Sequence, residues 1–370
     1  MTRTAAPAGE HRLADFARAA ISPRWAVVLL LVALLIAITA LNPSFADPSQ
    51  FVRFIQRVAP IAIVAIGQFF VIVSGEFDLS MGSLVTAQVV MAGTLIGQDD
   101  AKVIPTLIIM IVGGVVVGLV NGLVTTLLKV PSFIVTLGTM LAIYGGVLWW
   151  TGGAATGNPA ESVRQIGRSG ITDLPIVGTL PWAVVILAAV TVFAVWISYR
   201  PFGRTLIAIG DNAPAAAYAG APVWRTKTLA FVISSLSATV TGILLVGYAG
   251  VHPSVGQGYE FIAITAVVLG GVVLGGGRGT VLGALAGAFA LESLFMLLNF
   301  TSVPSTMRDA IQGAIIIIAV AYSGVVFAAK RRRPTLPEQS TPSAPDEALA
   351  DPAGAIPSPN PDAGSGAVRG

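Results

Sequence analysis

Long apolar runs, separated by short polar breaks, extend along most of this chain. A helix needs roughly 20 mostly apolar residues to cross a bilayer. Ten segments meet or approach that length: residues 25–43, 57–74, 79–97, 103–128, 131–152, 179–199, 228–250, 261–276, 280–300 and 309–329. The eighth is short and ends in the glycine-rich sequence VLGGVVLGGGRG, which is typical of a half-helix or a tight hairpin with the ninth. The pattern predicts an all-α polytopic membrane protein with about ten transmembrane helices.

The two ends of the chain differ from this apolar body. We expect residues 1–20 to form a cytoplasmic N-terminal arm and residues 21–330 to form the transmembrane domain. No small-residue cleavage motif of the usual kind follows the first apolar segment, so we expect it to be a retained span. Residues 331–370 are rich in Pro, Ala, Ser and Gly. Such a composition cannot bury enough apolar surface to offset its ordering entropy, which predicts a disordered cytoplasmic tail.

Short repeated motifs suggest that the transmembrane domain has two related halves. Val-Pro-Ser stands before the fifth span at residues 130–132 and before the tenth at residues 303–305. The spacing Gly118-x-x-x-Gly122 recurs as Gly283-x-x-x-Gly287. Two halves of five spans each would be related as an inverted repeat.

Composition agrees with a membrane protein and excludes several kinds of site. The chain is 55% hydrophobic and 11% charged, whereas a soluble domain is about 25% charged, and its mean hydropathy is +0.83. It has no cysteine and two distant histidines, His11 and His252, so we predict no metal site and no disulfide. The 41 glycines are suited to close helix packing in lipid.

The basic residues predict the orientation. With the N-terminus in the cytoplasm and ten crossings, 15 of the 21 Lys and Arg residues fall on the cytoplasmic side. Because positive residues are retained on that side, both termini are expected to be cytoplasmic. The net charge of +3 is small, and we predict no nucleic-acid partner.

Residues 200–227 form a long internal loop that predicts one short helix at the cytoplasmic surface. Asp211 and Asn212 offer an N-cap, Pro214 suits a first helical turn, and an alanine-rich run follows. Gly220 stands where a C-cap glycine belongs. The helix is expected to span about two turns. It either links two spans or docks into a groove of a soluble partner.

Residues 74–83, SGEFDLSMGS, place two acids between the second and third apolar segments. Three interpretations stay open: a solvated turn in which Asp78 caps the third span, a broken segment along a translocation path, or an ion-binding site. Glu260 opens the eighth span, where it either caps the helix or lines a pore. Glu292 lies within the ninth span, where a carboxylate usually faces a cavity or a partner.

Four ordered stretches between residues 50 and 325 resemble the permease subunits of ribose-type ABC sugar importers, within the branched-chain amino acid/ribose permease superfamily. The internal loop resembles the cytoplasmic coupling helix of that family, with matches at Gly203, Arg204, Ala208, Ile209, Gly210, Asn212, Ala215, Ala216 and Gly220, whereas Ala221 replaces the usual Ile. SGEFDLSMGS resembles S-G-G-I-D-L-S-V-G-S, with Glu76 where the family usually has Gly. Residues 129–140 and 256–287 resemble the motifs V-P-S-F-I-x-T-L-G and G-x-G-Y-E-L-D-A-I-A.

The resemblance implies a non-catalytic, multi-pass subunit of the bacterial inner membrane that imports a sugar-like solute. Its implied partners are an ABC ATPase that holds ATP and Mg²⁺, a second permease subunit as a homodimer or heterodimer, and an extracytoplasmic solute-binding protein. This chain has no P-loop and would bind no cofactor itself. The expected ATPase-coupling residues are Gly203, Arg204, Gly210, Asp211, Asn212, Ala215, Ala216 and Gly220. The expected translocation-path residues are Ser74, Glu76, Asp78, Ser80, Ser132, Thr136, Glu260 and Glu292.

Two other functions remain possible from the residues alone. An ion-coupled secondary transporter would use Glu76, Asp78 or Glu292 to bind H⁺ or Na⁺. A membrane-embedded enzyme for a lipid-linked substrate would need paired acids or a metal at one membrane face. The sequence offers little beyond Glu76 and Asp78 for that chemistry.

Overall fold

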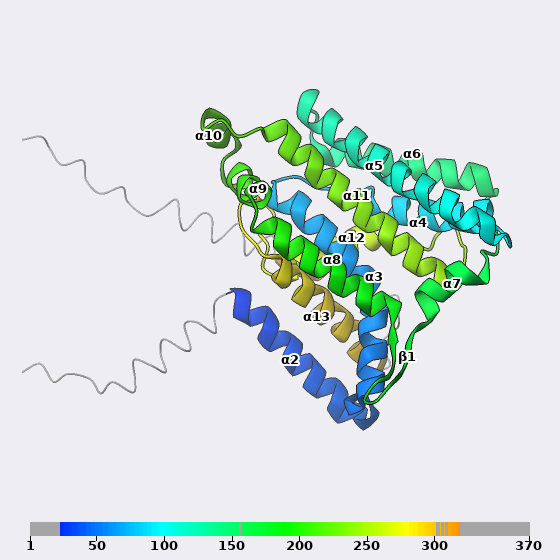
Figure 1. Ribbon diagram of the computed structural model, residues 1–370. Coiled ribbons are helices and arrows are strands. Elements are labelled where there is room, and N and C mark those ends of the chain that lie inside the picture. The colour runs from blue at the N-terminus through cyan, green and yellow to red at the C-terminus, as the bar shows by residue number, and fades with distance from the viewer. Residues whose placement is uncertain (1–22, 155–156, 301–303, 305–306, 308–309, 319–370) are drawn as a thin grey trace, which may run out of the picture. The chain divides into compact units, whose positions relative to one another are not determined.

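Helices account for most of the computed structural model, which describes residues 23–154, 157–300, 304, 307 and 310–318 (Figure 1). The predicted N-terminal arm and C-terminal tail lie outside these residues. So does part of the predicted tenth span, of which residues 310–318 are helical.

Five helices in the described part of the chain are long and apolar enough to cross a membrane. They are α3 (Pro48–Val73), α5 (Val103–Leu127, which the short η3 at Asp100–Lys102 precedes), α6 (Ser132–Thr151), α11 (Val223–Tyr248) and α13 (Val281–Phe300). Helices α8 (Trp182–Ser198) and α9 (Pro201–Asp211) pass the same test as a pair bent by 70°. The described residues therefore support five spans, or six with the bent pair, and the predicted ten are not confirmed.

Three further apolar helices are shorter. They are α2 (Pro23–Leu41), which the short η1 (Pro43–Ala46) follows, α4 (Met81–Met91), which the π-helical η2 (Ala92–Ile96) continues, and α12 (Tyr259–Leu269). Helix α4 and η2 together nearly fill the third predicted span, whereas α12 ends at Leu269, before the glycine-rich part of the eighth. Non-helical segments, residues 74–80 and 249–258, precede α4 and α12. Helix α12 is as short as the half-helix alternative predicts, and it also packs on α13 across a glycine-rich turn, as the hairpin alternative predicts.

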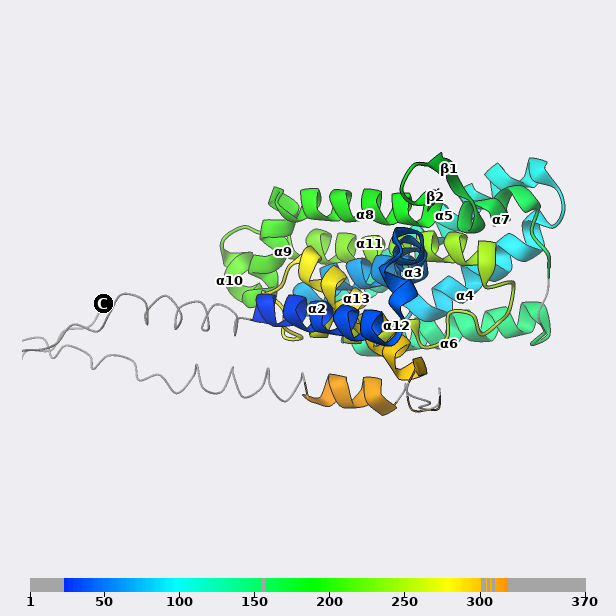
Figure 2. The same ribbon diagram turned by 90° about the horizontal axis from the view of Figure 1, so that it is seen from below.

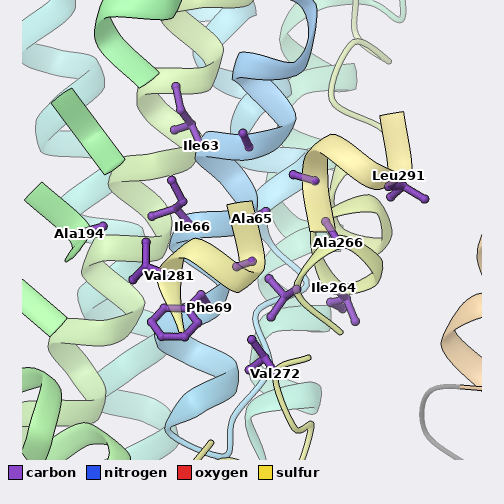
Figure 3. Close-up of a cluster of buried hydrophobic side chains, with 14 of the residues drawn as sticks. Ile63, Ala65, Ile66, Phe69, Ala194, Ile264, Ala266, Val272, Val281 and Leu291 are labelled. Carbon is purple, nitrogen blue, oxygen red and sulfur yellow. The ribbon is translucent and has the colours of Figure 1, made fainter. Parts of the chain in front are cut away.

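Helix α3 lies at the centre of the described helices and packs against α8, α11, α12 and α13 (Figure 1). Figure 3 shows this core, in which Ile63, Ile66 and Phe69 of α3 lie near side chains of α8, α12 and α13. The helix begins nine residues before its predicted start at residue 57. Pro48 occupies its first turn, and the Asp47 carboxylate accepts a 2.8 Å hydrogen bond from the Ser49 amide. This N-cap and the proline fix the start of the helix ahead of its apolar stretch.

A stripe of glycines allows α5 to contact α11 closely. A Cβ atom added to Gly118 would lie 2.6 Å from the Val232 Cα, and one on Gly122 would lie 2.6 Å from the Thr228 Cα. Helices that approach this closely exclude side chains larger than glycine from the interface. The first GxxxG motif therefore serves the packing of α5 on α11.

Two connecting segments are more ordered than the sequence predicts. Residues 153–178, which connect the fifth and sixth predicted spans, include α7 (Glu161–Arg168) and strand β1 (Gly170–Leu174), which pairs antiparallel with β2 (Gly178–Pro181). The described chain is thus not strictly all-α. The loop at residues 200–227 contains two helices, α9 and α10 (Ala213–Tyr218), instead of the predicted one. The prediction missed α9 because its apolar residues were assigned to a loop, although Gly203, Leu206 and Ile209 form one buried face.

Helices α9 and α10 lie at one end of α8 and α11, whereas α7 and the hairpin lie at the other, as Figure 2 shows. We call these the α10 end and the hairpin end.

We expect Gly118→Ala to lower the free energy of unfolding by about 1–3 kcal/mol, because the added methyl group must displace the α11 backbone. Unfolding of the purified protein in detergent micelles measures this change. The control is Gly145→Ala on α6, where an added Cβ meets no atom within 4 Å. Equal stability of the two variants would contradict close α5–α11 packing.

Candidate functional site

A sharp bend carries the chain from α8 into the α10 end. Gly203 lies against the backbone of Ser198, and a Cβ atom at Gly203 would overlap it. Pro201 starts α9 directly after the bend. The bend angle of 70° therefore requires glycine at this predicted coupling position.

Gly210 holds α9 on the rest of the protein through backbone contacts. A Cβ atom at Gly210 would overlap the Val73 carbonyl oxygen and the Gly277 amide. The Gly277 N–H in turn donates a 2.9 Å hydrogen bond to the Val73 carbonyl. The ends of α3 and α9 and the loop at residues 270–280 thus meet at one junction. The glycine run at residues 275–277 forms a tight turn that permits this close approach.

Helix α10 has the two caps that the sequence predicts. The Asn212 side chain accepts a 3.0 Å hydrogen bond from the Ala215 amide. At the other end, Gly220 adopts φ +86° and its N–H donates to the Ala217 carbonyl, at 2.9 Å. The Ala221 N–H donates to the Ala216 carbonyl at the same distance. These two bonds form a Schellman motif, which fixes a six-residue helix that would be unstable alone.

Most of α10 is exposed. Ala216 is buried, but Ala215 and Ala217 are exposed and the Tyr218 side chain is 94% accessible. Arg204 on α9 and Asp211 at its end are also exposed. The segment therefore presents a rigid and accessible surface with a large aromatic side chain at its end.

A buried hydrogen-bond network surrounds Asp78 in the segment between α3 and α4. One Asp78 carboxylate oxygen accepts from the Ser80 amide at 2.9 Å and from the Ser80 hydroxyl at 2.6 Å. The other oxygen accepts from the Ser234 hydroxyl of α11 at 2.6 Å. Asp78 is fully buried. It accepts hydrogen bonds from Ser80, the N-cap residue of α4, and joins this residue to α11. The segment at Asp78 is buried and is therefore not the solvated turn that one interpretation expected.

The network continues into α5 and α6. The Asn121 amide donates to the Ser80 hydroxyl at 2.9 Å, and the Thr139 hydroxyl donates to the Asn121 carbonyl at 2.6 Å. Four elements therefore share one polar chain: α11, the start of α4, α5 and α6.

Helix α6 also holds the backbone of Phe77. The Phe77 amide donates to the Ser132 hydroxyl at 3.1 Å, and the Thr136 hydroxyl donates to the Phe77 carbonyl at 3.4 Å. Ser74 makes a local bond instead, from its hydroxyl to the Val71 carbonyl at 2.7 Å. Ser132 and Thr136 are thus brought together with Asp78, whereas Ser74 finishes α3.

Glu76 pairs with Lys227 near the start of α11. The Lys227 Nζ lies 2.5 Å from a carboxylate oxygen of Glu76, and the two side chains are 14% and 18% exposed. This carboxylate is therefore already engaged by a cation of the protein.

The N-terminal ends of the two half-helices α4 and α12 meet. Glu260 packs on Gly82, where a Cβ atom would overlap its carboxylate, and Gly256 lies against the same turn of α4. The Gly256 amide donates to the Thr86 hydroxyl at 3.0 Å. Glu260 is buried, and one of its oxygens has no partner within the described residues.

This meeting point lies about halfway along the helices. Ser234, which binds Asp78, is roughly 16 Å from the start of α11 at 1.5 Å per residue. Helix α12 runs from this level back to the α10 end. The loop that follows α12 contacts Val73, the last residue of α3, which lies against α9 at that end. Helix α4 leads towards the hairpin end, since Gln88 reaches Thr239, five residues beyond Ser234 on α11.

Four residues of this arrangement were missed in the sequence: Asn121, Thr139, Ser234 and Lys227. Asn121 carried a signal, because it is the only strongly polar residue in the apolar α5. Nothing in the sequence pairs Lys227 with Glu76, because the two residues are 151 positions apart. The predicted Glu292 lies half-buried on α13. Among the described residues, no group of three or more His, Cys, Asp or Glu side chains is placed to hold a metal ion.

Comparison with known proteins identifies the family. Residues 50–320 match the protein family described as branched-chain amino acid transport system / permease component. The chain belongs to this permease family. The ribose import permease protein RbsC of Bacillus subtilis is 33% identical over 297 residues, which cover 78% of this chain and 88% of the relative. The autoinducer 2 import system permease protein LsrC of Klebsiella pneumoniae is 30% identical over 295 residues, with 80% and 84% covered.

No solved structure matches this permease significantly. Membership of the family and the apolar helices together indicate a multi-pass membrane protein. The relatives are import permeases by name, which favours the permease interpretation over the ion-coupled transporter.

We expect Asp78→Ala to destabilise the protein by about 1–3 kcal/mol for each buried donor that loses its acceptor. Asp78→Asn should cost less, because its remaining oxygen still accepts from Ser80 and the Ser234 hydroxyl can accept from the new amide. Unfolding free energies in detergent for both variants and for Ser234→Ala measure the difference. An Asp78→Ala variant as stable as the wild type would contradict the network.

Proposed function

We propose that this protein is the membrane-spanning permease subunit of an ABC importer for a sugar or sugar-like solute, located in the bacterial cytoplasmic membrane. The capped and exposed α10, held through α9 at the junction of three backbone segments, is the observation that carries this proposal. A soluble partner can press on such a helix without unfolding it. The ribose and autoinducer-2 import permeases named above support the solute class by analogy.

The residues of the α10 end have distinct roles in this proposal. Gly203 and Gly210 bring α9 into place, Asn212 and Gly220 cap α10, and the exposed Arg204, Asp211 and Ala215 offer contacts to an ATPase subunit. Ala216 anchors the inner face of α10. The ATPase partner binds ATP and Mg²⁺, while this chain binds no cofactor and hydrolyses nothing. A second permease subunit and an extracytoplasmic solute-binding protein complete the importer.

Paired helix lengths support an inverted repeat. Helices α3 and α11 both have 26 residues, and α4 and α12 both have 11. A non-helical segment that returns into the protein separates α3 from α4, and another separates α11 from α12. Half-helices whose N-termini meet near the middle of the membrane are typical of inverted-repeat transporters. With these half-helices counted as crossings, the described part of the chain would supply nine of the ten predicted crossings: α2, α3, α4, α5, α6, α8, α11, α12 and α13.

The meeting of α4 and α12 is our candidate for the translocation path. Irregular backbone at membrane depth is tolerated only beside protein or a water-filled cavity. Ser80, Ser132, Thr136 and Glu260 lie at or near this break. Asp78 is unsuited to an ion-coupled mechanism, because its oxygens accept three hydrogen bonds from Ser80 and Ser234.

Affinity purification of the crosslinked protein from its native membrane should recover a P-loop ATPase, identified by mass spectrometry. Tyr218→Glu should abolish this recovery, because it places a charge at the end of the exposed surface of α10. The control is Ile176→Glu at the hairpin end, where the side chain is 78% exposed. Failure to recover any ATPase with the wild-type protein would overturn the proposed function.

The proposed orientation places the α10 end in the cytoplasm and the hairpin end outside. The chain has no cysteine, so single cysteines report their side without interference. In intact spheroplasts, a membrane-impermeant maleimide should label Ile176→Cys at once and Tyr218→Cys only after lysis. The reverse pattern would invert the topology.

A further inference from the structure

We propose that the Glu76–Lys227 ion pair transmits movement of α10 to the buried segment at residues 76–80. The pair joins residues 151 positions apart. Lys227 stands a few residues after α10, and Glu76 stands two residues before Asp78. The inference rests on the proposed function, in which an ATPase subunit moves α10.

Burial distinguishes this pair from the other described ion pairs. Lys102–Asp99 and Arg164–Glu161 are local pairs three residues apart, and in each at least one side chain is more than half exposed. Exposed pairs of that kind contribute little because water and salt screen them. The Lys227 and Glu76 side chains are less than one-fifth exposed and in direct contact. An ion pair in these surroundings is screened less, and its loss leaves a mostly buried charge without a partner.

Helix α11 contacts the 76–80 segment at two points on one face. Lys227 and Ser234 are seven residues apart, which places them two turns apart on the same side of the helix. Their partners, Glu76 and Asp78, are two residues apart in a non-helical segment. A displacement of the first turns of α11 relative to this segment therefore strains both contacts together. The pair at Lys227 is the one nearer to α10.

The other side-chain contacts of this segment reach α5, α6 and a deeper position on α11. Phe77 is bound by Ser132 of α6, and Ser80 by Asn121 of α5. Asp78 is bound by Ser234, deeper along α11. Among the described side-chain contacts of the segment, the Glu76–Lys227 pair therefore lies nearest to α10 along the chain. Glu76 stands where the family motif usually has glycine, so the motif itself does not supply this ion pair.

The experiment measures hydrogen exchange of residues 74–80 in the complex purified with its ATPase, with and without ATP and Mg²⁺. We expect ATP to change exchange of this segment in the wild type. In Glu76→Gln and Lys227→Gln the ATP-dependent change should fall severalfold, because each variant leaves one mostly buried charge without its oppositely charged partner. The exchanged pair, Glu76→Lys with Lys227→Glu, should restore it.

The matched control is Lys129→Gln, an exposed lysine in the α5–α6 turn, which should respond to ATP as the wild type does. Melting temperature is measured on the same samples. A single variant that keeps the wild-type melting temperature but loses the ATP response has lost transmission and not merely stability, and the exchanged pair should recover the response. An ATP response that persists in both single variants, or that is absent from the wild type, would overturn the inference. A wild-type complex without an ATPase would instead overturn the proposed function.

Discussion

A helix that breaks inside a bilayer exposes backbone groups that lipid cannot hydrogen-bond, and this constraint governs the centre of the protein. Within the described residues, non-helical segments of this kind precede α4 and α12. At the first break the Asp78 carboxylate accepts the Ser80 amide and binds α11, so the break is satisfied within the protein. The buried Asp78 carboxylate is tolerated because both of its oxygens accept hydrogen bonds, one from Ser80 and the other from Ser234.

Glycine makes the same arrangement possible sterically. The α5 stripe at Gly118 and Gly122 lets α5 approach α11 until Asn121 reaches the Ser80 hydroxyl. At the α10 end, Gly210 and Gly277 let the end of α9 touch the end of α3. Close packing thus connects the exposed α10 to the same helix, α3, that leads into the buried break.

The two features explain how a small exposed helix can act at a distance. Helix α10 is short and depends on its caps and on α9 for its position. Under the proposed function, movement imposed on α10 would pass to α11, which begins at Val223 and holds the 76–80 segment through Lys227 and Ser234. In this arrangement the polar network and the exposed surface of α10 are connected through α11, although Asp78 and Ser80 lie far from α10 along the chain.

The sequence by itself determined the local structure. Apolar length predicted the helices, and residues 211–220 contained both caps of α10, because caps depend on neighbours within a few residues. It also carried the family motifs. Only the tertiary structure decided that the N-terminal ends of α4 and α12 meet, because an apolar run reads alike wherever it lies in the fold. It also decided that Glu76 meets Lys227 and that Asp78 meets Ser234. Such pairs join positions more than 150 residues apart, and the packing of glycine backbones, which no local pattern encodes, brings them together.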